Sequence, residues 1–143
     1  MPKFLYGKDG KGKLVRTKTP EVIMAEGHEV VSRELAREEL VDQLLSKILE
    51  EHGEIIQAMG EGDNNEILDE VADLTEVVNA LGKALGFNND EINAWRAKKS
   101  AKKGGFDEGI FIEYIVLNPD GDNYDFWLDH FRRNAHRYPE VKD

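Results

Sequence analysis

Two short stretches of the sequence each carry a pair of carboxylates three residues apart. Glu51 and Glu54 form the first pair, and Glu70 and Asp73 form the second. On a helix, residues at this spacing lie one above the other on the same face, where two negative charges repel each other. Two packed helices would bring the four carboxylates together as hard oxygen ligands, which suit Mg²⁺ or Mn²⁺. The spacing therefore predicts a site for a divalent metal ion.

The residues around each pair have the periodicity of a core-facing helix. Apolar side chains recur at helical spacing over residues 40–59 and again over residues 66–85. Glu51 lies inside the first apolar stripe and Glu70 inside the second, with the other carboxylate of each pair at the stripe's edge. A buried carboxylate costs several kcal/mol unless it is paired or bound to a metal ion. A single such residue would favour a salt-bridged boundary position, but the same offset on both helices favours a metal.

Turn and capping residues divide the chain into elements. We expect the first long helix over residues 36–59, and the turn at 60–65 is short enough to make the two long helices antiparallel neighbours. Three further helices are expected: 21–26 capped by Thr19, 91–103 capped by Asn89 or Asp90, and 124–137 capped by Asp122 or Asn123. The expected extended segments are a short piece at 13–16, a strand or extended link at 29–33, and an apolar segment at 110–117. Together these elements predict an all-α antiparallel helical bundle with minor extended segments at both flanks.

Length and charge limit the class of protein. The chain has 143 residues, enough for one domain with a core, and a formal net charge of −10. This charge argues against a nucleic-acid polymer as partner, because phosphates would be repelled. The absence of cysteine excludes a disulfide framework and a zinc–thiolate site. The sequence has no signal-peptide pattern and no apolar run of about 20 residues, so we expect a cytoplasmic protein with no membrane partner.

The helix expected at 91–103 carries the opposite charge. Five basic residues fall within eight positions, just before Gly104-Gly105-Phe106. They are Arg96, Lys98, Lys99, Lys102 and Lys103. Such a patch can bind an anion, or it can be a solvated helix end where cations are favourable, and alone the second interpretation is stronger. Beside four carboxylates, however, it points to a ligand with both metal-binding and phosphate groups, such as a nucleotide or another pyrophosphate.

Four segments resemble a known family. Lys47–Glu54 and Glu70–Asp73 resemble the KxxEExxE and ExxD motifs of the MazG-like superfamily of all-α nucleotide pyrophosphohydrolases, which includes phosphoribosyl-ATP pyrophosphohydrolase. Residues 102–106 resemble the basic-Gly-Gly-Phe ending of one branch, and residues 13–23 resemble that branch's N-terminal KLVRDKIPEII. Thr17 and Thr19 depart from this pattern, which has Asp and Ile there.

The resemblance implies a dimeric or tetrameric bundle that hydrolyses a nucleoside triphosphate, or a related phosphoribosyl nucleotide, in an Mg²⁺-dependent reaction. Cleavage between the α- and β-phosphates would give a monophosphate and pyrophosphate, and could serve to clean the nucleotide pool. By motif position the metal ligands would be Glu51, Glu54, Glu70 and Asp73. Glu50 and Glu51 would be the catalytic residues, with Glu50 as a further ligand or the group that orients the water. The substrate-binding residues would be Arg16, Lys18, Lys47, Lys99, Lys102 and Lys103.

We expect one domain over residues 1–143, with a helical core at 13–112. The C-terminal extension, residues 113–143, would pack on the bundle or on a partner subunit. Two long helices with wide apolar arcs have too little partner surface within one chain, which predicts a homodimer or homotetramer. Two other classes of protein stay open: a nucleotide-sensing module with little catalysis, and a helical assembly protein whose acidic clusters form interface salt bridges.

Overall fold

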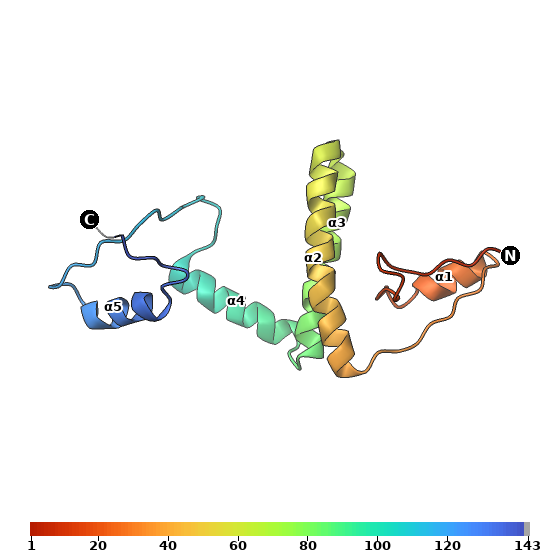
Figure 1. The fold of residues 1–143 in the computed structure, drawn as a ribbon, viewed down its shortest axis with the longest axis horizontal. Coiled ribbons are helices and arrows are strands. Elements are labelled where there is room, and N and C mark those ends of the chain that lie inside the picture. The colour runs from red at the N-terminus through yellow and green to blue at the C-terminus, as the bar shows by residue number, and fades with distance from the viewer. Residues whose placement is uncertain (142–143) are drawn as a thin grey trace. The chain divides into compact units, whose positions relative to one another are not determined.

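The computed structural model describes residues 1–141, which form helices joined by loops, with no strand in that range. The helices, shown in Figure 1, are α1 (Thr19–Ala25), α2 (Arg37–Glu61), α3 (Asn64–Ala84), α4 (Asn89–Lys103) and α5 (Tyr124–Arg133). Residue contacts divide the chain into two units, Met1–Lys103 and Gly104–Asp143. The all-α prediction is therefore confirmed over the described residues, and the segments expected to be extended or strand-like are loops.

The first unit is built on a hairpin of α2 and α3, which lie side by side in Figure 1. Gly62 ends α2 with a φ of 75°, a left-handed conformation that glycine adopts without a Cβ clash. Asp63 then caps α3, because its Oδ1 accepts hydrogen bonds from the backbone N–H groups of Asn65 and Glu66. The turn is thus shorter than the predicted 60–65, since both helices extend into that segment.

The hairpin buries little of its apolar surface. Within residues 1–141, the buried apolar side chains are Leu44, Ala58 and Val77. The rest of the apolar stripe on α2 includes Leu49, Ile56 and Met59, and all three are exposed. The stripe is therefore wider than the surface that α3 covers, and one chain leaves much of it in contact with water.

Helix α4 packs on the C-terminal end of α3 at a glycine. A Cβ atom at Gly82 would collide with Cδ1 of Ile92, so any other residue there would force the Ile92 side chain to shift. The start of α4 is fixed by a reciprocal pair of hydrogen bonds. The N–H of Glu91 donates to Asn88 Oδ1 over 2.8 Å, and the N–H of Asn88 donates to Glu91 Oε2 over 2.9 Å. Asn88 is therefore the cap instead of the predicted Asn89 or Asp90, because Glu91 at the third helical position completes a capping box.

The short helices differ from their predicted forms at the ends. Thr19 is the first residue of α1, and the cap position falls on Lys18, which makes no side-chain capping bond. Helix α5 ends at Arg133 instead of residue 137, whereas its cap position falls on Asn123, one of the two predicted residues, in a left-handed conformation and without a side-chain capping bond. In the second unit, α5 and the following turn gather the aromatic rings of Phe126, Trp127, His130, Phe131 and Tyr138. None of the described helices has the length and hydrophobicity needed to span a bilayer.

We expect the exposed stripe of α2 to be covered in a homodimer or homotetramer, because its apolar side chains gain free energy when they leave water. Sedimentation velocity at micromolar concentration should show a mass of at least two chains. Ile56→Glu, in the stripe, should lower that mass. Val31→Glu changes an apolar side chain that is also exposed but lies outside the hairpin, so it should leave the mass unchanged. A stable species with the mass of one chain would contradict this expectation.

Candidate active site

The acidic residues of α2 and α3 meet around Glu51. One carboxylate oxygen from each of Glu50, Glu51 and Glu54 lies within 4.8 Å of the others. The same holds for Glu51, Glu70 and Asp73, so Glu51 belongs to both groups. The structure thus brings the four predicted metal ligands together with Glu50. We call these five residues the acidic cluster.

The position of Glu51 follows from the helical repeat. Leu44, Glu51 and Ala58 are seven residues apart, about two turns of helix, and all three are buried, with Glu51 only 4% exposed. On α3, Glu70 is seven residues before the buried Val77 and is half-buried. Each glutamate therefore occupies a position that the repeat would otherwise give to an apolar side chain. The hairpin turns both carboxylates into the seam between the helices.

This burial leaves two carboxylate oxygens unsatisfied. Among residues 1–141, Oε2 of Glu51 and Oε2 of Glu70 are buried and lack a hydrogen-bond partner. A buried acceptor without a partner is costly, and more so when it carries charge. The donor set consists of carboxylate oxygens alone, the ligands that Mg²⁺ and Mn²⁺ prefer. The residues present therefore fit a divalent metal ion.

One lysine of the same motif lies inside the acidic cluster. Nζ of Lys47 is 3.2 Å from Oε1 of Glu51 and 4.0 Å from Oε1 of Glu50. Its side chain is only 16% exposed, since it lies one helical turn before the two glutamates on α2. Lys47 thus neutralises part of the charge in the seam and places a cation beside the proposed metal ligands.

Residues 13–18, which we call the N-terminal arm, bring two more cations to the acidic cluster. Nζ of Lys13 is 2.7 Å from Oε1 of Glu50, and Nη2 of Arg16 is 2.5 Å from Oδ1 of Asp73. The arm therefore contacts both long helices. Arg16 was predicted to bind substrate, but Lys13 was not. The sequence feature that could have identified Lys13 is its position in the KLVR segment, which resembles the family's N-terminal motif.

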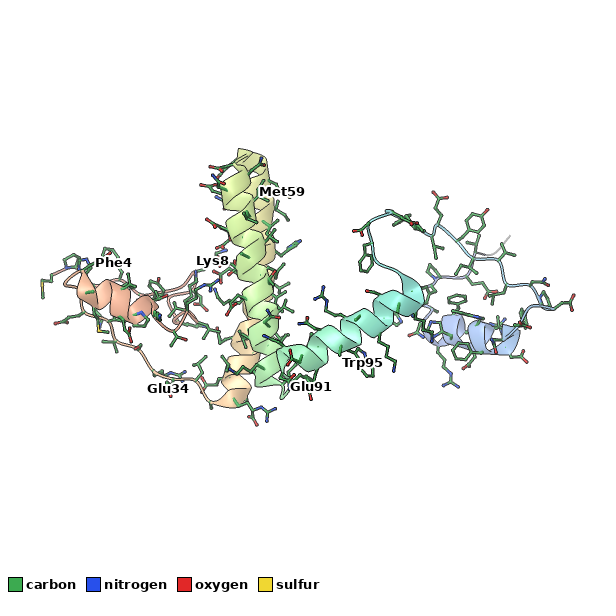
Figure 2. All side chains as sticks on the ribbon, turned by 180° about the vertical axis from the view of Figure 1, so that it is seen from behind. Phe4, Lys8, Glu34, Met59, Glu91 and Trp95 are labelled. Carbon is green, nitrogen blue, oxygen red and sulfur yellow. The ribbon has the colours of Figure 1, made fainter. Side chains whose placement is uncertain are left out.

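The other predicted substrate-binding residues lie elsewhere. Lys18 is exposed at the start of α1. Lys99, Lys102 and Lys103 are exposed on the second half of α4, and none of the four forms an ion pair within residues 1–141. Figure 2 shows the side chains of α4, with Trp95 labelled, standing out from the helix. The structure of one chain thus groups Arg16 and Lys47 with the carboxylates but does not group the other four residues with them.

The carboxylates of the cluster differ in their tendency to hold a proton. Burial raises the pKa of Glu51, although Lys47 opposes the effect. Burial and then the neighbouring carboxylates, Glu54 first, raise the pKa of Glu70 to about 7. In contrast, the hydrogen bond from Lys13 lowers the pKa of Glu50. Near neutral pH the cluster therefore combines an ionised Glu50 with a Glu70 that readily gains or loses a proton.

Glu70→Gln should flatten the pH dependence of stability in the metal-free protein. A carboxyl whose folded-state pKa is raised stabilises the fold while protonated, and this is lost as pH rises from 4.5 to about 7. We expect wild type to melt at a lower temperature at pH 8 than at pH 5.5, and the variant to remove about 2–4 °C of that difference. Melting in a chelator, followed by circular dichroism, measures this, with Glu38→Gln on the exposed start of α2 as control. Parallel pH curves for wild type and Glu70→Gln would contradict it.

Comparison with known protein families gives one match. The model of the phosphoribosyl-ATP pyrophosphohydrolase family matches residues 16–95, which include Arg16, all of α2 and α3, and the start of α4. Neither the curated proteins nor the solved structures contain a match to this chain. The family match spans more than half of the 143 residues and contains all five members of the acidic cluster. The chain therefore belongs to the phosphoribosyl-ATP pyrophosphohydrolase family of the MazG-like superfamily, whose members hydrolyse phosphoanhydride bonds of nucleotides.

Proposed function

We propose that this protein hydrolyses a nucleoside triphosphate, or a related phosphoribosyl nucleotide, between its α- and β-phosphates. The reaction requires a divalent metal ion, Mg²⁺ or Mn²⁺, and gives a monophosphate and pyrophosphate. The observation that carries this proposal is the acidic cluster around Glu51, with two buried oxygens that have no partner and with Lys47 and Arg16 beside it. Oxygen ligands for a cation next to cations for phosphates suit a nucleotide substrate.

Four carboxylates of the cluster would hold the metal. They are Glu51 and Glu54 from α2 and Glu70 and Asp73 from α3. When bound, the ion neutralises phosphate charge and lowers the pKa of a coordinated water. The seam restricts Glu51, because its side chain is buried in the same row as Leu44 and Ala58. The ligands on both helices are therefore positioned before substrate arrives.

Glu50 and Glu51 take different parts in this reaction. Glu50 is held by Lys13 and Lys47, which keep it ionised, so it orients the attacking water through a hydrogen bond. Glu51 has one buried oxygen without a partner, and an oxygen of this carboxylate that is not used to hold the metal could accept the proton of the water. Lys47 contacts both residues and fixes their spacing while its remaining N–H groups face the phosphates.

The distribution of charge along the hairpin favours one side for the approach of the substrate's phosphates. An open groove on the turn side of the cluster is acidic, lined by Glu54, Glu61, Glu66, Asp69 and Glu70 together with Gln57 and Ala58. The basic residues lie on the opposite side, where Lys13 pairs with Glu50 and Arg16 with Asp73. A triphosphate is repelled by the acidic groove and attracted to the basic side. The phosphates therefore approach from the N-terminal arm.

A turnover screen tests the proposal directly. Nucleoside triphosphates and phosphoribosyl-ATP are incubated with Mg²⁺, and pyrophosphate and orthophosphate are measured separately. Release of pyrophosphate without orthophosphate supports α–β cleavage. Orthophosphate as the first product would overturn the cleavage position, and tight nucleotide binding without turnover would support a sensing module instead.

Glu51→Gln and Glu70→Gln should each abolish metal-dependent hydrolysis. Each variant removes one anionic ligand, and we expect kcat/KM to fall by at least about 100-fold. Mg²⁺ affinity measured by calorimetry should fall as well, while circular dichroism shows an intact helical fold. Glu38→Gln removes the same charge at an exposed position outside the cluster and should behave as wild type. Full activity in either cluster variant would contradict the proposal that these carboxylates hold a catalytic metal ion.

Neutralising the lysines of α4 tests whether they bind phosphate. If Lys99, Lys102 and Lys103 meet the substrate, Lys99→Ala and Lys103→Ala should each lower kcat/KM by about 10-fold. Mg²⁺ affinity without nucleotide should not change, because no lysine ligates the metal. Lys83→Ala, at the end of α3, is the matched control. Unaltered kinetics in both variants and in the triple variant would show that these lysines form a solvated helix end.

A further inference from the structure

The N-terminal arm occupies the acidic cluster in a way that a bound metal would disturb. Nη2 of Arg16 lies 2.5 Å from Oδ1 of Asp73. Asp73 is also part of the group, with Glu51 and Glu70, whose oxygens lie within 4.8 Å of one another. A divalent ion bound by this group and the guanidinium of Arg16 would both seek the same carboxylate. They would also repel each other across a few ångströms.

Arg16 and Lys47 both pair with carboxylates of the cluster, but they are held with different strength. The side chains of Arg16 and Asp73 are 60% and 40% exposed, and such open ion pairs contribute little to stability. Lys47 differs, because its side chain is only 16% exposed and its backbone belongs to a long helix. Arg16 is carried by a loop, so it can leave the cluster without disrupting a helix. A metal ion held by several carboxylates should therefore displace Arg16 and leave Lys47 in place.

We propose that Arg16 and a divalent metal ion compete for Asp73, so that metal binding releases this end of the N-terminal arm from α3. Arg16 then faces the side of the cluster from which phosphates approach. The inference rests on the proposed metal site and adds an order of events to it: the metal binds first, the arm moves, and Arg16 becomes free for an anion. In the metal-free protein, Arg16 acts as a substitute cation that offsets the charge of Asp73.

A second arginine in the chain supplies a matched comparison. Arg33 pairs with Glu39 over 2.8 Å, and these side chains are 68% and 51% exposed. This pair resembles that of Arg16 and Asp73 in type and exposure, but neither of its residues belongs to the acidic cluster. A metal ion at the cluster has no reason to disturb it. Salt screening, in contrast, should weaken both pairs alike.

Fluorescence anisotropy of a label beside each arginine tests the proposal. The chain has no cysteine, so Thr17→Cys and Ser32→Cys each provide a unique, exposed labelling position. Mg²⁺ should lower the anisotropy at residue 17 and leave residue 32 unchanged, relative to KCl at equal ionic strength. With Arg16→Ala added, the anisotropy at residue 17 should be low already and should not respond to Mg²⁺. Calorimetry should show Mg²⁺ binding about 2- to 5-fold tighter in Arg16→Ala than in wild type or Arg33→Ala.

The outcomes separate this inference from the proposed function. If calorimetry detects Mg²⁺ binding but the anisotropy at residue 17 stays constant or rises, the competition is wrong and the metal site stands. An equal response to KCl and to Mg²⁺ also overturns the competition, since screening would then explain the motion. If Mg²⁺ does not bind to the wild-type protein or to Arg16→Ala, both the metal site and the competition fall.

Discussion

The structure depends on a carboxylate placed where the helical repeat calls for an apolar side chain. Glu51 lies in the same buried row as Leu44 and Ala58, and one of its oxygens has no partner among the described residues. An ionised group in such a place opposes folding unless a cation compensates it. The chain supplies part of that compensation through Lys47, and Lys13 and Arg16 neutralise the neighbouring carboxylates. The seam of the hairpin is thus built around charge as much as around apolar contact.

Charged residues in the seam also limit the stability of the hairpin in a single chain. Few apolar side chains are buried between α2 and α3, and the positions that could add to the core at the centre are held by Glu51 and Glu70. Several other apolar residues of α2 are exposed, namely Leu45, Leu49, Ile56 and Met59. A site that needs several carboxylates in one small volume thereby reduces the stability of its own scaffold, a common exchange between activity and stability.

The sequence predicted the acidic cluster because its information is local and periodic. Carboxylates at i and i+3 within an apolar stripe specify both the helix and its face, so the sequence alone predicts that Glu51, Glu54, Glu70 and Asp73 lie together. Helix ends were less predictable, because they depend on a few local hydrogen bonds such as the reciprocal pair between Asn88 and Glu91. The pairing of Arg16 with Asp73 spans 57 residues, and no periodicity in the sequence encodes a contact between a loop and a distant helix.

The two-residue turn of Gly62 and Asp63 has a consequence for how this chain can vary. Leu44 and Val77 are each seven residues farther from the turn than Glu51 and Glu70, so equal steps along both helices keep the two rows level. A residue inserted into α3 between its cap, Asp63, and Glu70 would turn Glu70 and Asp73 by about 100° about the helix axis and move them off the shared face. Surface loops are normally where lineages gain and lose residues. Here we expect the number of residues between Asp63 and Glu70 to be as constrained as the carboxylates of the acidic cluster, since it sets the face of α3 on which Glu70 and Asp73 lie.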